Sequence, residues 1–324
     1  MKLTFVNVGY GEAILLECPD PSRPGGVFTM VMDGGSGETE EYQDRSSGRV
    51  PMADYLTARG LDHLDVITAT HVHEDHLCGL VPLPDLWPPK ELWQTLPEGL
   101  HRALTPPPLL EDATPSQRKF LQSMRDYLTL CRRVESSGGV LRTLSAGWPL
   151  RPCPGLTIRC LGPSREKAAE LAERYTALHR ERDPAVFRTL LNALDASMNN
   201  YSAILLLDYR GTRILLPGDT NCLGYGGIAP EDLPAHIFKI GHHGQRDGAD
   251  AALLQAVRPR AVVCCASSDR RYQSADPDTL RIFSGSGAAL YFSDCPPVLG
   301  EVPPPHQALV FTVGAEGAFT AEYQ

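Results

Sequence analysis

The sequence lacks features that define several classes of protein. The 324 residues contain no run of about 18 or more apolar residues, so the sequence predicts no membrane-spanning helix. Residues 1–17 lack the apolar core and the cleavage site of a signal peptide. The nine cysteines are odd in number and scattered, without a CxxC or CxxH pair, which disfavours a disulfide framework and a zinc finger. We therefore expect a cytoplasmic protein with reduced thiols.

Basic charge is also scarce. The chain has 30 lysines and arginines against 39 aspartates and glutamates, which gives a net charge of −9. This balance argues against broad electrostatic binding to nucleic acid. With 42% hydrophobic and 21% charged residues, the composition is that of an ordinary globular protein with ample apolar residues for a core. We expect a single domain over residues 1–324 with no membrane partner, and the sequence indicates no particular protein partner.

What the chain does contain is a dense group of metal-ligand residues, His71-Val72-His73-Glu74-Asp75-His76. It directly follows residues 64–70, an apolar and β-branched run that predicts a buried strand. Open α/β sheets bind ligands at the carboxyl ends of strands, and imidazole and carboxylate groups suit cations such as Zn²⁺. In a tight turn the first two histidines can face one cation, while Asp75 and His76 face a second. A plain surface turn is the alternative, but this spacing after a buried strand is uncommon.

Two later strand ends carry the same residue types. Residues 203–208 and 212–216 predict a hairpin, and its second strand is followed by Gly218-Asp219. Residues 237–240 predict another strand, which leads into Gly241-His242-His243-Gly244. A carboxylate at a strand end, beside a glycine that permits close approach, can bridge two cations. These positions therefore supply further candidate ligands.

Together these stretches resemble the metallo-β-lactamase superfamily. The pattern His71-x-His73-x-Asp75-His76 is similar to the superfamily's metal-binding signature. Residues 6–14, 199–219 and 239–244 resemble motifs of the hydrolase domain of ComEC-type competence proteins, and they occur in the same order. The resemblance spans nearly the whole chain. It implies an α/β protein with a four-layer αββα metallo-β-lactamase sandwich, here with a helical and proline-rich insertion.

The resemblance also implies roles for individual residues. It assigns two divalent metal ions, Zn²⁺ or Mn²⁺, to six ligands: His71, His73, Asp75, His76, Asp219 and His243. Asp219 would bridge the two ions. Asp75 and His242 would act in catalysis, with His242 as the proton donor to the leaving group. The exchange of roles between His242 and His243 is the alternative.

Two further residues are expected near the metals. Asp33 follows a predicted strand over residues 27–32, and the resemblance implies that it supports the metal-site loops; a purely structural turn is the alternative. Asn199 falls where the superfamily has a third histidine on the first metal. An amide oxygen is a poorer zinc ligand than imidazole, which predicts a weaker first site or one that prefers Mn²⁺.

Two segments, at about 82–150 and 164–197, are predicted to elaborate this fold and to cover the metal site as a lid. The first is rich in proline up to residue 116, which excludes long regular elements there. Helical periodicity follows over 116–135 and again over 165–197. Five basic residues in the first segment form a candidate substrate surface: Arg118, Lys119, Arg125, Arg132 and Arg133. A solvated helix face is the alternative for them.

These patterns predict a metal-dependent hydrolase with a dinuclear centre and a bridging hydroxide. Such a centre suits phosphodiesters, so we expect a phosphodiesterase or nuclease that acts on a nucleic acid or a nucleotide. Hydrolysis of a lactone, amide or thioester is an alternative, because a fold does not fix its substrate. A metal-containing sensor or binding module without catalysis is a third hypothesis, from a different class.

Overall fold

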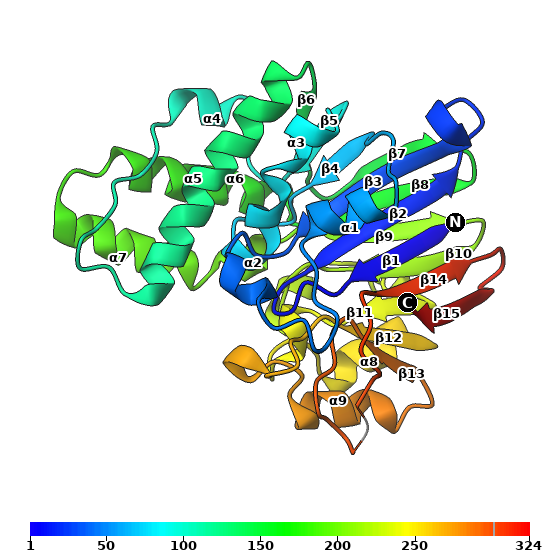
Figure 1. Cartoon of the computed structure of the whole chain (residues 1–324). Helices are drawn as coiled ribbons and strands as arrows, with labels where there is room; N and C mark the ends of the chain where they lie inside the picture. Colours follow the sequence, from blue (N-terminus) through cyan, green and yellow to red (C-terminus); the bar gives the residue numbers. More distant parts are fainter. Residues whose placement is uncertain (301) are drawn as a thin grey trace.

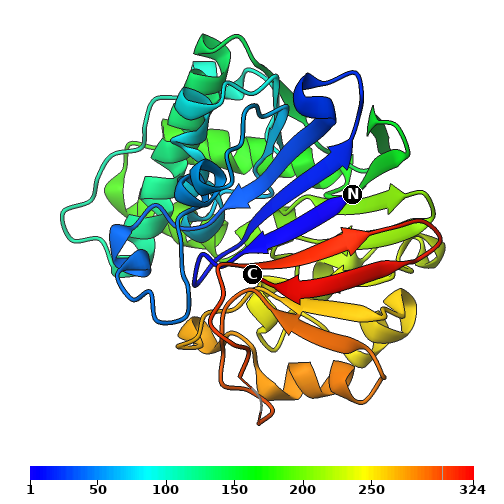
Figure 2. The ribbon, with the colours of Figure 1, turned by 45° about the vertical axis from the view of Figure 1, so that its right-hand side comes forward.

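The computed structural model describes residues 1–300 and 302–324. Two β-sheets pack face to face, and helices cover the outer face of each sheet (Figure 1). The chain therefore has the four-layer αββα metallo-β-lactamase sandwich that the sequence predicted. The view in Figure 2 separates the blue and red strands of the first sheet from the yellow and orange elements of the second.

The first sheet joins the two ends of the chain. Its strands are β1 (Lys2–Val6), β2 (Ala13–Pro19), β3 (Val27–Gly34), β4 (Val66–Thr68), β5 (Glu91–Gln94), β6 (Val140–Thr143), β14 (Ala308–Val313) and β15 (Phe319–Tyr323). They follow the order β15-β14-β1-β2-β3-β4-β5-β6. Strands β3 to β6 run parallel, so their carboxyl ends meet at one edge of the sheet.

The second sheet comes from the middle and later parts of the chain. Its strands are β7 (Trp148–Cys153), β8 (Leu156–Gly162), β9 (Ile204–Tyr209), β10 (Thr212–Leu216), β11 (Ile237–Lys239), β12 (Ala261–Cys264) and β13 (Ala289–Phe292). They follow the order β13-β12-β11-β10-β9-β8-β7, with β10 to β13 parallel. Side chains of both sheets, such as Phe5, Leu207 and Phe311, are fully buried in one apolar layer between them. Burial of that layer fixes how the two sheets face each other.

Helices complete the outer layers. They are α1 (Met52–Ala58), α2 (Glu74–Leu77), α3 (Leu83–Leu86), α4 (Leu100–Ala103), α5 (Pro115–Ser136), α6 (Arg165–Arg180), α7 (Pro184–Asp195), α8 (Ala251–Val257) and α9 (Pro277–Ser284). A second apolar cluster lies under α1, α5, α6 and α7, and a third lies under α8 and α9. Within the described residues, the helices are too short or too polar to cross a lipid bilayer.

The structure differs from the sequence prediction in the two proposed elaborations. Residues 82–150 are not wholly an insertion, because β5 and β6 belong to the first sheet and β7 begins the second. These strands are short, and β5 and β7 lie beside prolines or contain them, so they carry no visible period. Residues 165–197 form two helices instead of one segment. The break comes where Asp183 accepts hydrogen bonds from two backbone N–H groups of the next turn and Pro184 begins α7.

Candidate metal centre

The metal-ligand motif lies in a tight turn between the first sheet and a short helix. Strand β4 ends at Thr68, and α2 begins at Glu74, so Asp75 and His76 lie in its first turn. The glycine loop after β1 packs directly on this turn: a Cβ on Gly11 would lie 2.3 Å from the carbonyl oxygen of Asp75. The N–H of Glu12 donates to the same oxygen over 3.1 Å. The loop between β1 and β2 therefore fixes the backbone of the motif.

Four side chains from both sheets converge beside this turn and form the buried half-site: Asp75, His76, Asp219 and His243. Each offers one ligand atom, and these atoms all lie within 4.8 Å of one another. The Nε2 atom of His243 is 2.9 Å from Asp219 and 3.0 Å from Asp75, and the Nε2 atom of His76 is 3.2 Å from Asp219. This donor set suits one divalent cation.

The other ring nitrogens of these histidines have fixed partners. The Nδ1 atom of His76 is 2.7 Å from Asp33, whose carboxylate also accepts from the N–H and the hydroxyl of Thr70. The Nδ1 atom of His243 is 2.7 Å from the carbonyl oxygen of Cys265. Such partners orient a ligating imidazole and select its tautomer. Asp33 thus contacts both a predicted ligand and the residue before the motif, and its support of the metal-site loops stays a prediction.

Asp219 contacts a buried lysine side chain. The side chain of Lys239 is fully buried. Its Nζ atom lies 3.3 Å from Asp219 and forms an ion pair with Glu12. Burial disfavours a charge on Lys239, but Glu12 and Asp219 raise its pKa, so it stays an ammonium group. Glu12 and Lys239 therefore hold the carboxylate that is predicted to bridge the metals.

The charges of the buried half-site favour a bound cation. Burial alone would keep His243 neutral, but Asp219 and Asp75 raise its pKa to about 9. Burial likewise opposes charge on Asp219, yet His243, His76 and Lys239 hold its pKa well below the usual value. The carboxylates thus attract protons to the two histidines. A divalent cation can replace these protons, since metal binding releases them.

The remaining candidate ligands form the open half-site: His71, His73 and Asn199. The Nε2 atom of His71 and the Nδ1 atom of His73 are 3.1 Å apart, as expected for two nitrogens that face one cation. Burial, followed by the nearby His76, lowers the pKa of His71 well below its usual value and keeps its imidazole neutral. The amide oxygen of Asn199 is buried and has no hydrogen-bond partner in the described part of the chain, and Asn199 lines the same cleft as His73, so it stays a candidate third ligand.

A cleft of about 320 Å³ opens over both half-sites. His242 lines this cleft, and its Nδ1 atom is 2.7 Å from Asp247. The ring of His243 points instead into the buried half-site. The geometry therefore favours His243 as the ligand and His242 as the residue that faces substrate, in the order that the sequence resemblance implied.

The structure brings only one of the five basic candidates to the cleft. Lys119 lines it and forms ion pairs with Glu38 and Glu74. The guanidinium group of Arg118 donates to the carbonyl of Ala113, and that of Arg125 donates to the carbonyl of Pro107. Arg133 pairs with Asp85. Among the described residues of the cleft lining, Arg118, Arg125, Arg132 and Arg133 do not occur. Direct substrate contact stays a prediction for Lys119, and the structure gives it no support for the four arginines.

Several residues near the site carried no clear signal in the sequence. Asp195 lies 3.2 Å from the Nε2 atom of His73, although the two are 122 positions apart. Tyr10 and Tyr272 line the cleft from two different loops. Lys239 was visible only as part of a motif that resembles a family, without an assigned role. These contacts arise from the packing of distant segments, which residue patterns do not reveal.

Comparisons with known proteins show what the chain as a whole is similar to. No family model matches the chain. The chain is similar to the ComE operon protein 3 of Bacillus subtilis (strain 168), with 22% identity over 289 residues that cover 87% of this chain. It spans 30% of the length of that relative. The predicted resemblance to the metallo-β-lactamase superfamily, and to its ComEC-type branch, is confirmed.

Solved structures show weaker likeness. The CmlA β-hydroxylase E377D mutant is 12% identical with a TM-score of 0.49, and the match covers 96% of this chain and 54% of that one. Zn²⁺-bound PqqB from Methylobacterium extorquens is 12% identical with a TM-score of 0.48, over 91% and 98% of the two chains. Human tRNase Z, short form, is 14% identical with a TM-score of 0.40, over 85% and 95%. These scores lie below 0.5. The positions of the candidate ligands therefore follow from the sheet order and the side-chain geometry of this chain alone.

Proposed function

This chain has the metallo-β-lactamase fold and resembles the ComEC-type hydrolase domain, and from that premise we propose that it is a metal-dependent hydrolase that cleaves phosphodiesters. The observation that carries the proposal is the convergence of the buried and open half-sites under one cleft. Two divalent ions in such a site lower the pKa of a shared water and neutralise charge on a phosphoryl centre. The residues that would hold them are the six predicted ligands, with Asn199 as a weaker seventh.

The charge of the cleft supports a role for metal in substrate binding as well as in chemistry. Its lining includes four carboxylates and one lysine: Glu74, Asp75, Asp195, Asp219 and Lys119. An anionic phosphodiester would be repelled by these groups unless cations neutralise them. We therefore expect substrate affinity, and not only turnover, to depend on metal.

His242 is proposed as the proton donor. Asp247 holds its Nδ1 atom, which leaves Nε2 as the nitrogen that can carry a proton to the leaving group. The side chain of His242 is 21% exposed, so it can exchange that proton with solvent between turnovers. The cytoplasmic location predicted from the cysteine pattern stays a prediction.

The test is a panel of substrates with the purified protein, loaded with Zn²⁺ or Mn²⁺ and compared with chelated protein. The panel contains single-stranded DNA, duplex DNA, RNA, a cyclic dinucleotide, bis(p-nitrophenyl) phosphate, a lactone and a thioester. We expect turnover of phosphodiesters that chelation abolishes and added metal restores. Turnover of the lactone or thioester alone would overturn the proposal, and retained metal without turnover of any member would favour a binding module.

A matched variant pair excludes a contaminating hydrolase. His76→Ala removes a ligand of the buried half-site and should abolish metal-dependent turnover. His63→Ala removes a histidine that lies outside the cleft lining and contacts Asp62 and the carbonyl of Val27. It should leave turnover unchanged, so activity that survives both changes equally belongs to another protein.

A further inference from the structure

The loop over residues 270–275 holds an exposed tyrosine at the rim of the cleft in an unusual backbone conformation. Tyr272 is 57% exposed and has a φ of +53°. Arg270, Gln273 and Ala275 in the same loop also have positive φ values, between 49° and 61°. Residues other than glycine adopt this region at a cost, which persists only where the surroundings impose it. The loop is therefore held in place against its own preference.

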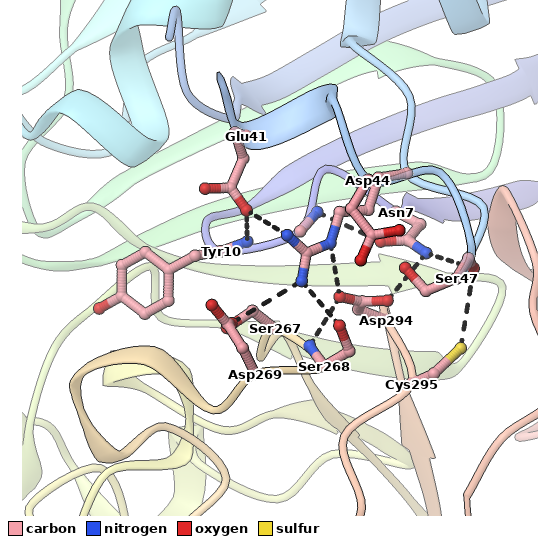
Figure 3. A network of polar contacts seen from close by, with 12 residues as sticks. Asn7, Tyr10, Glu41, Asp44, Ser47, Ser267, Ser268, Asp269, Asp294 and Cys295 are labelled. Carbon is pink, nitrogen blue, oxygen red and sulfur yellow. Dashed lines mark hydrogen bonds and ion pairs between the residues drawn. The ribbon is translucent and has the colours of Figure 1, made fainter. Parts of the chain in front are cut away.

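An ionic network around Glu41 provides that hold, and Figure 3 shows the part of it that joins Glu41, Tyr10 and Asp294. The carboxylate of Glu41 accepts a hydrogen bond from the N–H of Tyr10 over 3.0 Å and pairs with both Arg49 and Arg271. Arg49 is 6% exposed and also pairs with Asp294 at 3.0 Å. Glu41 thus fastens the backbone of Tyr10 and the neighbour of Tyr272 at the same point.

A second set of contacts ties the loop to the metal centre. The N–H of Ala275 donates to the carbonyl of His243 over 2.9 Å. The ring of Tyr10 lies 4.6 Å from the ring of His243, and the ring of Tyr272 lies 5.0 Å from that of Tyr10, nearly edge to face at 65°. Three rings therefore lead outward from the buried half-site, and the outermost one, Tyr272, presents its surface to solvent.

We propose that Tyr272 is a stacking platform for an unpaired nucleobase of the substrate whose phosphodiester lies at the metal centre. The inference rests on the proposed function, and it adds the substrate class: single-stranded nucleic acid or a short nucleotide, not duplex DNA. Every base has a face that can stack, while a paired base in a duplex does not expose it. A ring whose backbone is already fixed at the rim of the cleft loses little freedom when the base arrives.

The charge of the cleft supports such a platform. Among the described residues, Lys119 is the one lysine or arginine that lines the cleft, and it already pairs with two glutamates. A net charge of −9 gives no long-range attraction for a polyanion. Beyond the proposed metal ions, contacts with the base are therefore a source of binding energy that does not depend on positive charge.

The test compares two substrates that differ only in the base: the p-nitrophenyl ester of thymidine 5′-phosphate and the same ester of abasic deoxyribose 5′-phosphate. Stacking stabilises the bound substrate and the transition state equally, so its loss should raise KM and leave kcat unchanged. We expect Tyr272→Ala to raise KM for the thymidine ester roughly fivefold or more and to leave kcat and the abasic ester unchanged. Tyr272→Phe keeps the ring and should behave like the native protein.

Binding without turnover separates this inference from the proposed function. Thymidine 5′-phosphate and abasic deoxyribose 5′-phosphate are titrated into the metal-loaded protein by calorimetry. Tighter binding of the thymidine compound that Tyr272→Ala removes supports the platform, even if no phosphodiester is hydrolysed. Hydrolysis of both esters with equal KM in native and Tyr272→Ala proteins would overturn the platform and leave the phosphodiesterase intact.

Two further variants serve as controls. Leu223→Ala removes another exposed apolar side chain, 81% exposed and outside the cleft lining, and should change neither KM. Arg271→Ala releases the loop from Glu41 while it leaves the ring in the chain. It should weaken the preference for the thymidine ester without loss of metal, whereas an unchanged preference would show that the network does not position Tyr272.

Discussion

The buried and open half-sites lie side by side, yet the protein holds them very differently. In the buried half-site, Asp33 and the carbonyl of Cys265 fix the outer nitrogens of His76 and His243, and both rings are fully buried. In the open half-site, His73 is 19% exposed and turns its outer nitrogen to Asp195, the last residue of α7. Asn199 is the third candidate ligand there, at the position where the resemblance predicts a histidine. In the proposed two-ion centre, the body of the sandwich would hold one ion, and α7 would help to hold the other through Asp195.

This difference predicts two ions of unequal affinity. Rigid ligands with fixed outer partners lose little entropy when they bind a metal, and imidazole is a better zinc ligand than an amide. The open half-site also depends on α7, so movement of that helix would reach its ligands through Asp195. The following changes test the comparison, from the largest expected effect to the smallest.

Asp219→Ala should have the largest effect, because this carboxylate belongs to the buried half-site and is predicted to bridge the two metal ions. We expect both ions to be lost and metal-dependent turnover to disappear. Metal content after gel filtration, measured by mass spectrometry, checks this. Asp62→Ala changes an exposed carboxylate and is the control. Two ions tightly held by the Asp219→Ala protein would exclude the bridging role.

The adjacent histidines should fail in different ways. His243→Ala removes a ligand and should release the ion of the buried half-site. His242→Ala should keep both ions and lose rate by roughly 10²–10⁴-fold, as for a missing general acid. The loss should shrink for a nitrophenolate leaving group, which needs no proton. Equal metal loss in both variants would show that the two roles are not divided in this way.

Asp195→Asn should affect the open half-site alone. Without the carboxylate, the imidazole of His73 is a weaker and less oriented ligand, which costs roughly 10–100-fold in metal affinity. A titration with Mn²⁺ or Zn²⁺ should then show two well-separated binding steps. Asn199→His is the opposite test and should bring the two affinities closer. Unchanged binding in both variants would mean that the second ion uses other ligands.

Lys119→Ala should have the smallest effect. Its ammonium is already shared with Glu38 and Glu74, so its loss should raise KM about threefold, in line with the modest energy of partly exposed ion pairs. Arg132→Glu should change KM less than Lys119→Ala, because Arg132 does not line the cleft within the described residues. A larger effect for Arg132→Glu would restore the predicted substrate surface on α5.

The sequence predicted the parts of the site that depend on local order. The motif after β4 and the residues after β10 and β11 each follow an apolar strand, and the parallel arrangement of such strands brings their ends together. The sequence missed β5, β6 and β7, since strands of only four to six residues leave no clear period, and prolines interrupt the pattern around β5 and β7. It also missed the contact of His73 with Asp195 and the ion pair of Lys239 with Glu12. Each joins segments that only the packed sandwich brings together.

The ligands of the buried half-site come from both sheets, and this affects the stability of the folded chain. Asp75 and His76 extend from the first sheet, and Asp219 and His243 extend from the second, so a bound ion would cross-link the two halves of the sandwich. An ion that binds only the folded chain stabilises it by mass action, by roughly 1.4 kcal/mol for each tenfold excess over its dissociation constant. The supply of metal would then set how long the folded chain survives heat or proteolysis, apart from any catalysis.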